Sequence, residues 1–463
     1  MLSLADAILQ EDTASIHQHL RYGVDVNQLD EYGFIPLIEA AIVDNSDIAK
    51  LLLQNGADPN KQDVTGGTAL QWAVENSNQT FCELLLNQGA DPNAYNFAGQ
   101  PVLAMTILRQ QSALRKLLIE AGADVVFAQD YINTKLLGHM FELVGTVSII
   151  DPKNQFVDTD FEGFYLEVTL GIISESLLQF QNHFAARQLR RFAGLSRYIV
   201  EIIQRSLRLI KFQQYRVDIR KHQKEIDQLI TQEPLLIPVG YEGHAITFIK
   251  SGDIWVKCDR REDSRLYDNI MFYRIRNTQN ATKELLKSLI YKKQSSQFIN
   301  EDLDQILGLE PITELKVDAQ ISGNCSWANV EATIPALFFL MLMQTSNDAQ
   351  TIAHFKSLAI NYFYRWREWN KDRALHNCIK SFEEGDAIRK ACKAEILAAI
   401  LFQRCNTESR ADRERIELIL SLLIDSSYQY ILKNYLRGYF MESYTEEGKK
   451  FAALLKEYGY SLR

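Results

Sequence analysis

The chain has 463 residues, which is too long for one compact core and predicts a multidomain protein of two to four domains. Hydrophobic residues make up 46% of the sequence and charged residues 24%, an ordinary globular composition that excludes extensive disorder. The formal net charge of −9 gives the chain as a whole no electrostatic attraction to nucleic acid or to anionic membranes, so we expect neither as a partner.

The N-terminal residues, the longest apolar run and the cysteines bear on export, membrane insertion and metal binding. The N-terminal residues MLSLADAILQEDT carry acids where a secretory signal would carry basic residues before an apolar core. The longest apolar run, 334–343, is about half the length that spans a bilayer and predicts a buried helix. Six scattered cysteines without a C-x-x-C pair argue against a zinc site or a disulfide framework. We expect a soluble protein without metal or cofactor, exported without a cleaved N-terminal signal.

Residues 1–135 repeat with a period of 33. Glycine recurs at positions 23, 56, 89 and 122, and the triplets LLL, LLL and LLI keep the same step at 51, 84 and 117. This pattern resembles the ankyrin repeat, a hairpin turn followed by two antiparallel helices. The glycine would end the second helix in the left-handed conformation, and the triplet would supply its buried face. The sequence predicts an all-α solenoid of about four repeats, with degenerate units at both ends.

An array of this kind predicts protein binding. The contacts would come from the hairpin tips, near Glu31–Tyr32, Val64–Thr65 and Phe97–Ala98. The alternative is that the array only stabilises the N-terminal end of the chain.

Residues 136–345 predict an α+β domain. The segments 142–151 and 162–171 are rich in β-branched and aromatic residues and predict strands. Residues 175–230 predict one or two long amphipathic helices, with eleven Lys or Arg and two acids between 187 and 224. This basic face is either a solvated surface or a docking site for an acidic partner.

Within that domain, residues 244–258 predict a β-hairpin. Residues 244–250 alternate like a strand, Ser251–Gly252 is a turn signal, and IWVKC follows as a second strand. A two-residue turn at Ser251–Gly252 would place His244 directly opposite Asp259, although a shift of the turn by one residue moves the opposite position by two. The carboxylate would hold the imidazole in one tautomer and stabilise its charged form. Alternatively, the pair lies exposed at the open end of the hairpin.

Cys325 follows Ser322-Gly323-Asn324 at the start of a helix predicted over 326–334. A thiol at a helix N-terminus is favoured as the thiolate, and a nearby imidazolium would lower its pKa further. Gln320 could offer its side-chain amide to an oxyanion beside the backbone N–H of Cys325, and Trp327 would wall the cleft. The alternative is a small buried cysteine in an ordinary loop-to-helix junction.

Together these residues resemble the His-Asp-Cys cysteine peptidases, which include the adenovirus protease, the SUMO-specific proteases and effectors similar to YopJ. The resemblance covers residues 240 to 332. It implies that His244 is the general base, Asp259 its orienting carboxylate, Cys325 the nucleophile and Gln320 the oxyanion donor. Gln320 has four residues between it and the cysteine, one fewer than the family has.

Residues 346–463 predict an all-α C-terminal region, since apolar residues recur there at helical spacing and glycine is rare. Together with the short ankyrin array and the peptidase-like centre, this order resembles the ankyrin effectors of Legionella in the AnkH family. The resemblance implies a bacterial effector that a type IV secretion system delivers to the host cytoplasm or nucleus. It would bind a host protein through the repeats and cleave an acyl bond with the Cys-His-Asp site. An acyltransferase with the same triad and a non-catalytic adaptor with a peptidase-like fold are the alternatives.

Overall fold

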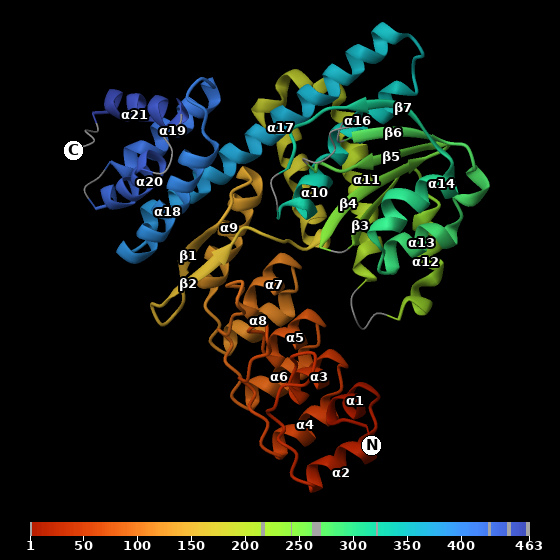
Figure 1. The fold of residues 1–463 in the computed structure, drawn as a ribbon, viewed down its shortest axis with the longest axis vertical. Helices are drawn as coiled ribbons and strands as arrows, with labels where there is room; N and C mark the ends of the chain where they lie inside the picture. The colour runs from red at the N-terminus through yellow and green to blue at the C-terminus, as the bar shows by residue number, and fades with distance from the viewer. Residues whose placement is uncertain are drawn as a thin grey trace. The chain divides into compact units, whose positions relative to one another are not determined.

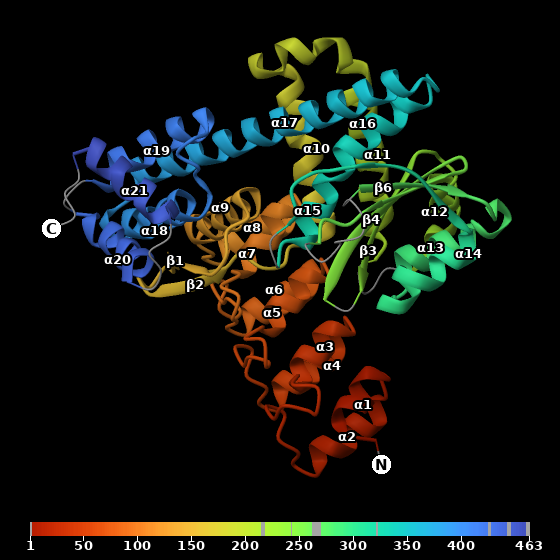
Figure 2. The ribbon, with the colours of Figure 1, turned by 45° about the horizontal axis from the view of Figure 1, so that its top comes forward.

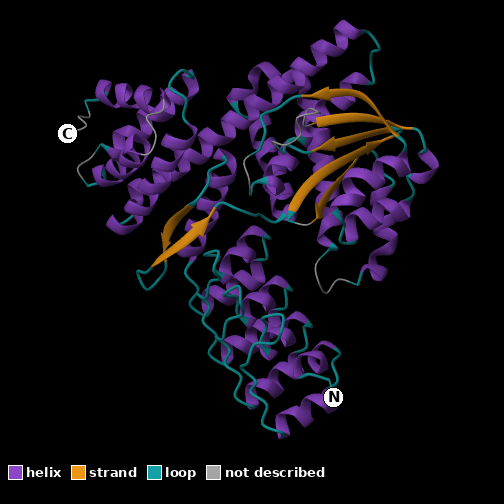
Figure 3. Cartoon of the chain, viewed as in Figure 1, coloured by secondary structure: helices purple, strands orange, loops and turns teal. Residues whose placement is uncertain are grey.

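A computed structural model describes residues 2–213, 218–241, 243–261, 270–320, 323–424, 427–441 and 446–459 (Figure 3). The predicted fold class is confirmed: helical repeats at the N-terminus, a five-stranded sheet domain in the middle and helices at the C-terminal end. The chain forms two compact units, which we describe one at a time. One comprises Met1–Leu136, Gly145–Asp160 and His376–Arg463, and the other Leu137–Val144 and Phe161–Leu375. The boundaries predicted at 135/136 and 345/346 stay predictions.

The repeats form antiparallel helix pairs at the predicted period (Figure 1). The first helices of three successive pairs begin 33 residues apart, at Pro36, Ala69 and Val102. Gly56 takes a positive φ of 89° directly after the end of a second helix, as the repeat pattern predicts. The pairs are α1 (Leu4–Leu9) with α2 (Thr13–Arg21), α3 (Pro36–Ile42) with α4 (Ser46–Gln54), α5 (Ala69–Glu75) with α6 (Gln79–Asn87), and α7 (Val102–Leu108) with α8 (Ser112–Glu120).

An asparagine ladder joins each repeat to the next. The side chain of Asn60 donates to the carbonyl oxygen of Gly89 at 2.9 Å and accepts from the backbone N–H of Asp91 at 2.7 Å. Asn27 and Asn93 make the equivalent pair of bonds one repeat earlier and one repeat later. These amides satisfy loop backbone groups that have no helix or sheet partner, which accounts for an asparagine at each of these positions.

The same unit contains a two-stranded hairpin and the helical residues from His376 onward. The hairpin strands β1 (Thr146–Ile150) and β2 (Phe156–Asp160) pack through Ile149 and Val157 against α9 (Val125–Phe141). A buried ion pair of 2.6 Å joins Lys393 to Asp130. The C-terminal region is helical, as predicted: α17 (Ala349–Glu384), α18 (Ala387–Arg404), α19 (Arg410–Leu423), α20 (Gln429–Met441) and α21 (Glu446–Glu457).

The strand predicted over 142–151 is confirmed as β1, but the strand predicted over 162–171 is wrong. Helix α10 (Leu166–Asn182) begins in that segment. Its buried residues Leu170, Ile173, Leu177 and Phe180 are spaced by three and four positions, so one apolar helical face runs past the β-branched stretch and determines the structure.

The segment 175–230 is more broken than the long helices predicted for it. Helices α11 (Ala193–Lys211) and α12 (Gln223–Ile230) are preceded by 3₁₀ helices at Phe184–Phe192 and Ile219–His222. Arg190, Arg197 and Arg208 are exposed, whereas Ile199 and Ile203 are buried. Of the basic residues counted in this segment, Arg216 lies outside the described residues. Both interpretations of the basic face stay predictions.

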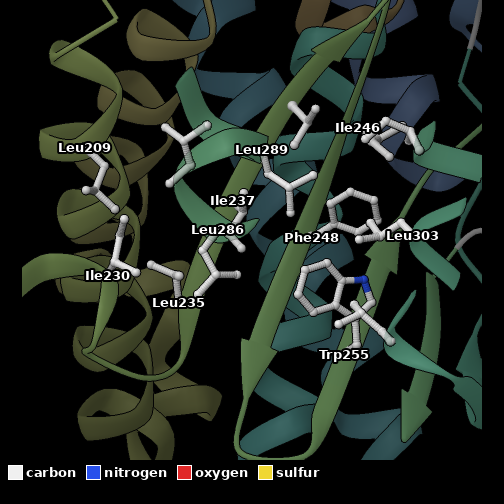
Figure 4. Packing of buried hydrophobic residues seen from close by; sticks show 14 of the residues in the cluster. Leu209, Ile230, Leu235, Ile237, Ile246, Phe248, Trp255, Leu286, Leu289 and Leu303 are labelled. Atoms are coloured by element: carbon white, nitrogen blue, oxygen red, sulfur yellow. The ribbon is translucent and has the colours of Figure 1, made fainter. Parts of the chain in front are cut away.

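The central sheet is an antiparallel meander in sequence order. Its strands are β3 (Leu235–Tyr241), β4 (His244–Ser251), β5 (Ile254–Cys258), β6 (Ile270–Ile275) and β7 (Leu309–Leu315). On one face, Phe248 and Trp255 pack against Leu209 of α11, Ile230 of α12 and Leu286 of α13 (Figure 4). The helices that follow β6 are α13 (Lys283–Tyr291) and α14 (Leu303–Leu307), with a 3₁₀ helix at Thr278–Asn280 and a π helix at Phe298–Asp302.

Two apolar helices, α15 (Cys325–Glu331) and α16 (Thr333–Met343), also pack on the sheet. Phe339 of α16 meets Phe272 of β6 edge to face, with ring centroids 5.1 Å apart. The prediction that 334–343 is a buried helix is confirmed for Ile334 to Leu340. Among the described residues, the stretch Cys325–Met343 is long and apolar enough to cross a membrane, but 83% of it is buried inside the protein.

The predicted hairpin exists, with a different turn. Ser251 pairs with Ile254, so the two turn residues are Gly252 and Asp253. A type II′ turn needs a positive φ at its first central position, and Gly252, with φ of 59°, supplies it. The predicted register, with His244 directly opposite Asp259, is therefore wrong by two positions.

Candidate active site

The three predicted catalytic residues come from three elements of the sheet domain. His244 is the first residue of β4, Asp259 follows the last residue of β5, and Cys325 is the first residue of α15. Helix α15 packs against β4, the strand that begins with His244 (Figure 2).

His244 and Asp259 meet in spite of the shifted register. The imidazole Nε2 lies 3.0 Å from Asp259 Oδ1, and both side chains are mostly buried, at 15% and 12% exposure. Arg261 donates to the second oxygen, Oδ2, from Nε at 3.2 Å. Burial raises the pKa of Asp259, but the hydrogen bond from His244 and the positive charges of His244 and Arg261 outweigh it and hold the pKa below its usual range. The lowered pKa favours the ionised form of the Asp259 carboxylate at neutral pH.

The thiol of Cys325 lies within hydrogen-bonding reach of the His244 imidazole. Burial lowers the pKa of His244, but the hydrogen bonds to Asp259 and Cys325 raise it to about 9. Burial raises the pKa of Cys325, but His244 and backbone hydrogen bonds from Ala245 and Ser326 lower it below its usual value. Both shifts favour a thiolate–imidazolium pair at neutral pH.

Unlike the partly exposed Cys325, the four buried cysteines have pKa values that are raised. Burial raises the pKa of Cys82 and Cys392 to about 12 and of Cys378 to about 11, and it also raises the pKa of Cys258. The thiolate is the reactive form of a cysteine. Cys325 therefore differs from these four because its pKa is lowered, which favours the thiolate.

Gln320 lies beside the segment after β5 that carries Asp259, which we call the carboxylate loop. Its backbone N–H donates to the carbonyl oxygen of Arg260, the residue after Asp259, at 2.7 Å. The side chain is buried, and within the described part of the chain its Oε1 accepts no hydrogen bond. Ser322, between Gln320 and the cysteine, lies outside the described residues. The role of Gln320 as an oxyanion donor stays a prediction.

Trp327 does not wall a cleft, as the sequence had suggested. It is fully buried, stacks on His139 with centroids 5.8 Å apart, and donates from Nε1 to Glu331 at 2.8 Å. A tryptophan two residues into the helix faces away from the direction of Cys325, and its role is to anchor α15.

Asn329 is a site residue that the sequence interpretation missed. It lies one helical turn after Cys325 and is 1% exposed. Its Nδ2 donates to the carbonyl oxygen of Ala245 at 2.6 Å, and its Oδ1 accepts from the backbone N–H of Arg260 at 2.7 Å. Those two residues directly follow His244 and Asp259, so one amide joins the three segments that carry the triad. The signal in the sequence was an asparagine four positions from the cysteine on an otherwise apolar helix.

A buried charge cluster supports the loop that carries Asp259. Arg260 has no exposed surface, donates to Glu142 Oε1 at 2.9 Å and lies 3.6 Å from Glu331. Arg367 of α17 contacts the same two carboxylates. Burial raises the pKa of Glu142, but the charges of Arg367 and Arg260 outweigh it and lower the pKa. Paired charges of this kind hold a chain segment in place, because moving one partner away leaves the remaining charge buried and unpaired.

Across the part of the chain that the structure describes, no group of three or more His, Cys, Asp or Glu side chains could hold a metal ion.

Comparisons with known proteins agree with the repeats and with the whole fold. A family model for ankyrin repeats matches residues 4–96 in three copies. No curated protein matches the chain. A solved structure of the Legionella effector AnkH is similar over 100% of this chain and 98% of that chain, with 37% sequence identity and a TM-score of 0.84.

Proposed function

Because the chain belongs to the family of the Legionella effector AnkH, we propose that it is a secreted bacterial effector that acts inside a host cell. Its ankyrin repeats bind a host protein, since arrays of this kind mediate protein–protein interaction. Cys325, His244 and Asp259 form a thiol-dependent site for acyl cleavage, with Gln320 as an oxyanion donor.

One observation carries the catalytic part of this proposal. A cysteine at a helix N-terminus lies within hydrogen-bonding reach of a histidine whose other side bonds a buried carboxylate at 3.0 Å. Nucleophile, base and orienting group are the components that cysteine hydrolases require. Because Nε2 of His244 bonds Asp259, Nδ1 is the ring nitrogen left to exchange a proton at the thiol.

The reaction begins with attack of the Cys325 thiolate on an acyl carbonyl carbon. A C–S bond forms and the carbonyl oxygen becomes an oxyanion, which the backbone N–H of Cys325 and the amide of Gln320 would stabilise. The His244 imidazolium then gives its proton to the leaving group as the C–N or C–O bond breaks. Neutral His244 next takes a proton from water as the water attacks the thioester. The C–S bond breaks, and the thiolate and the imidazolium are restored.

An electrophilic active-site probe tests the site on the full chain. We expect the probe to label wild-type protein on Cys325 at pH 7, and labelling should be lost in Cys325→Ser. Cys405→Ser is the matched control, because Cys405 is the other partly exposed cysteine of the chain, and this variant should label normally. Labelling that persists in Cys325→Ser, or that falls on another cysteine, contradicts the assignment.

The same labelled site separates the alternative functions. Release of the acyl group to water identifies a hydrolase, whereas its appearance on an amine or hydroxyl of an acceptor identifies an acyltransferase. If Cys325→Ala and His244→Ala leave the cellular effects intact while substitutions at the hairpin tips remove them, the protein acts as a binding adaptor and the catalytic proposal is wrong.

A further inference from the structure

The first repeats contain an acidic cavity of about 330 Å³. It lies among α1, the loop that follows α2, and the start of α3, and α1 and α3 lie side by side (Figures 1 and 2). None of its lining residues is Lys, Arg or His. The charged lining residues are Asp6, Asp25, Asp30, Glu31 and Glu39.

Glu39 differs in residue type from the equivalent positions of the two repeats that follow it. The residues 33 and 66 positions later are the apolar Trp72 and Met105, whereas the residue 33 positions earlier, in the degenerate first unit, is Asp6. Glu39 is 1% exposed, lines the cavity, and accepts a hydrogen bond at neither carboxylate oxygen from any described residue. Burying a carboxylate without a donor is costly, and a packed apolar residue would avoid that cost.

The repeat of α5 and α6 shows which group the repeat of α3 and α4 lacks. There, Oδ2 of Asp63 accepts a hydrogen bond from Nε1 of Trp72 at 3.1 Å. Asp30 is the equivalent of Asp63, and its Oδ1 accepts from the backbone N–H groups of Tyr32 and Phe34 in the same way. Its Oδ2 is buried, and the donating indole is replaced by Glu39, whose carboxyl group can hydrogen-bond Asp30 only when it is protonated. Asp30 and Glu39 therefore share one proton, and no N–H group of the described residues donates to Asp30 Oδ2 or to either carboxylate oxygen of Glu39.

The electrostatics of the cavity agree with this geometry. Burial raises the pKa of Glu39 to about 8, and the neighbouring carboxylates of Asp30 and Asp6 contribute to the increase. In the empty cavity, Glu39 therefore keeps a proton at neutral pH. A cation in contact with the carboxyl groups of Asp30 and Glu39 would displace that proton. Both groups would then be ionised, and the cation would pair with two negative charges.

We propose that this cavity binds the cationic end of a Lys or Arg side chain from a protein partner. The inference rests on the proposed role of the repeats in protein binding and names the chemical group that they recognise. A metal ion fits less well, because the described residues hold no group of three or more side chains arranged as metal ligands. An ammonium or guanidinium group brings the N–H donors that Asp30 and Glu39 lack, and the exposed ring of Tyr32 at the cavity can pack on its aliphatic stem.

Three pentapeptides test this proposal on the full chain by ligand-observed NMR. They are Ac-Gly-Ser-Xaa-Ser-Gly-NH₂ with Lys, Arg or norleucine at the centre. We expect at least one basic peptide to bind with a Kd on the order of 1 mM, and the norleucine peptide to bind about tenfold more weakly or not at all. Glu39→Met and Glu39→Gln should each weaken the basic peptide about tenfold. Met is the residue at the equivalent position 105, so the repeat accommodates it. Asp47→Asn, which changes an exposed carboxylate of α4 that does not line the cavity, is the control and should bind normally.

Several results overturn the proposal. These are equal binding of the basic and norleucine peptides, undiminished binding to both Glu39 variants, or no binding of either basic peptide up to ~10 mM. If micromolar Ca²⁺ displaces a bound basic peptide from wild-type protein but not from Glu39→Gln, the cavity is instead a metal site. Because Cys325 labelling is measured separately, failure here leaves the test of the catalytic proposal intact.

Discussion

The repeat array and the candidate active site are stabilised by contacts of very different range. In the array, Asn60 reaches only into the next repeat, to Gly89 and Asp91, and the same bonds recur at Asn27 and Asn93. In the sheet domain, the cluster around the carboxylate loop joins Glu142 to Arg367, which are 225 positions apart. Local, repeated contacts make the array predictable, whereas the site exists only once distant segments have packed.

The largest expected effect breaks the catalytic pair itself. His244→Ala removes the imidazolium that stabilises the Cys325 thiolate, so alkylation of Cys325 by iodoacetamide at pH 7 should slow about a hundredfold. Mass spectrometry of the labelled peptide gives the rate. His354→Ala, an exposed histidine on α17, is the matched control and should leave the rate unchanged. Equal rates in wild type and His244→Ala would show that the two side chains are not coupled.

A core substitution in the array sharpens the contrast between the two compact units. Leu85 of α6 has no exposed surface, and Leu85→Ala should cost about 2–5 kcal/mol because it leaves a cavity. Hydrogen exchange should show the loss in the repeats, while the alkylation rate of Cys325 stays at its wild-type value. A comparable loss of protection in strands β3 to β7 would mean that the array and the sheet domain unfold as one cooperative unit.

Asn329→Ala tests how the triad is positioned. The substitution leaves a buried carbonyl group at Ala245 and a buried N–H at Arg260 without partners, which should cost about 1–3 kcal/mol. Because the segments that carry His244 and Asp259 are both released, Cys325 alkylation should also need a higher pH. Thermal unfolding and the pH dependence of alkylation measure the two effects. Asn329 acts only in stability if the pH dependence does not move.

The smallest expected effect is at a hairpin tip. Phe97 is 74% exposed, and Phe97→Ala should change stability by less than about 0.5 kcal/mol and leave Cys325 alkylation unchanged. If the tips bind the partner, the same substitution should remove partner binding in a pull-down from host cells. A variant that folds, labels and binds like wild type would remove this tip from the proposed binding surface.

The sequence predicted the array well because its signals are periodic and local. It predicted the β4–β5 hairpin but misplaced the turn, since Ser-Gly and Gly-Asp are both turn sequences and only the backbone conformation of Gly252 distinguishes them. The segment 162–171 failed for a related reason: its β-branched residues belong to a longer helical face.

At the site, residue type and chain order were enough to suggest Cys325, His244 and Asp259 as a set. They could not supply Asn329 or the Arg260 cluster. The partners of those side chains lie in segments remote along the chain, and a buried amide or ion pair has no local sequence pattern.

The shifted pKa values of His244 and Asp259 also make the stability of the folded protein depend on pH. Because the pKa of His244 is raised from 6.5 to about 9, its stabilising contribution is complete below pH 6.5 and is lost as the pH rises through about 9. The lowered pKa of Asp259 acts in the opposite direction: its contribution is present above pH 3.8 and is lost as the pH falls below that value.

The central claim is that Cys325 is held as a thiolate by the His244 imidazolium, and the rate of Cys325 alkylation as a function of pH tests it most directly. The account predicts that wild-type protein reacts rapidly well below pH 9.0, the ordinary pKa of a thiol, with a second change near pH 9 as His244 loses its proton. In His244→Ala the rapid reaction at neutral pH should disappear. A single rise centred near pH 9, identical in wild type and His244→Ala, would contradict the account.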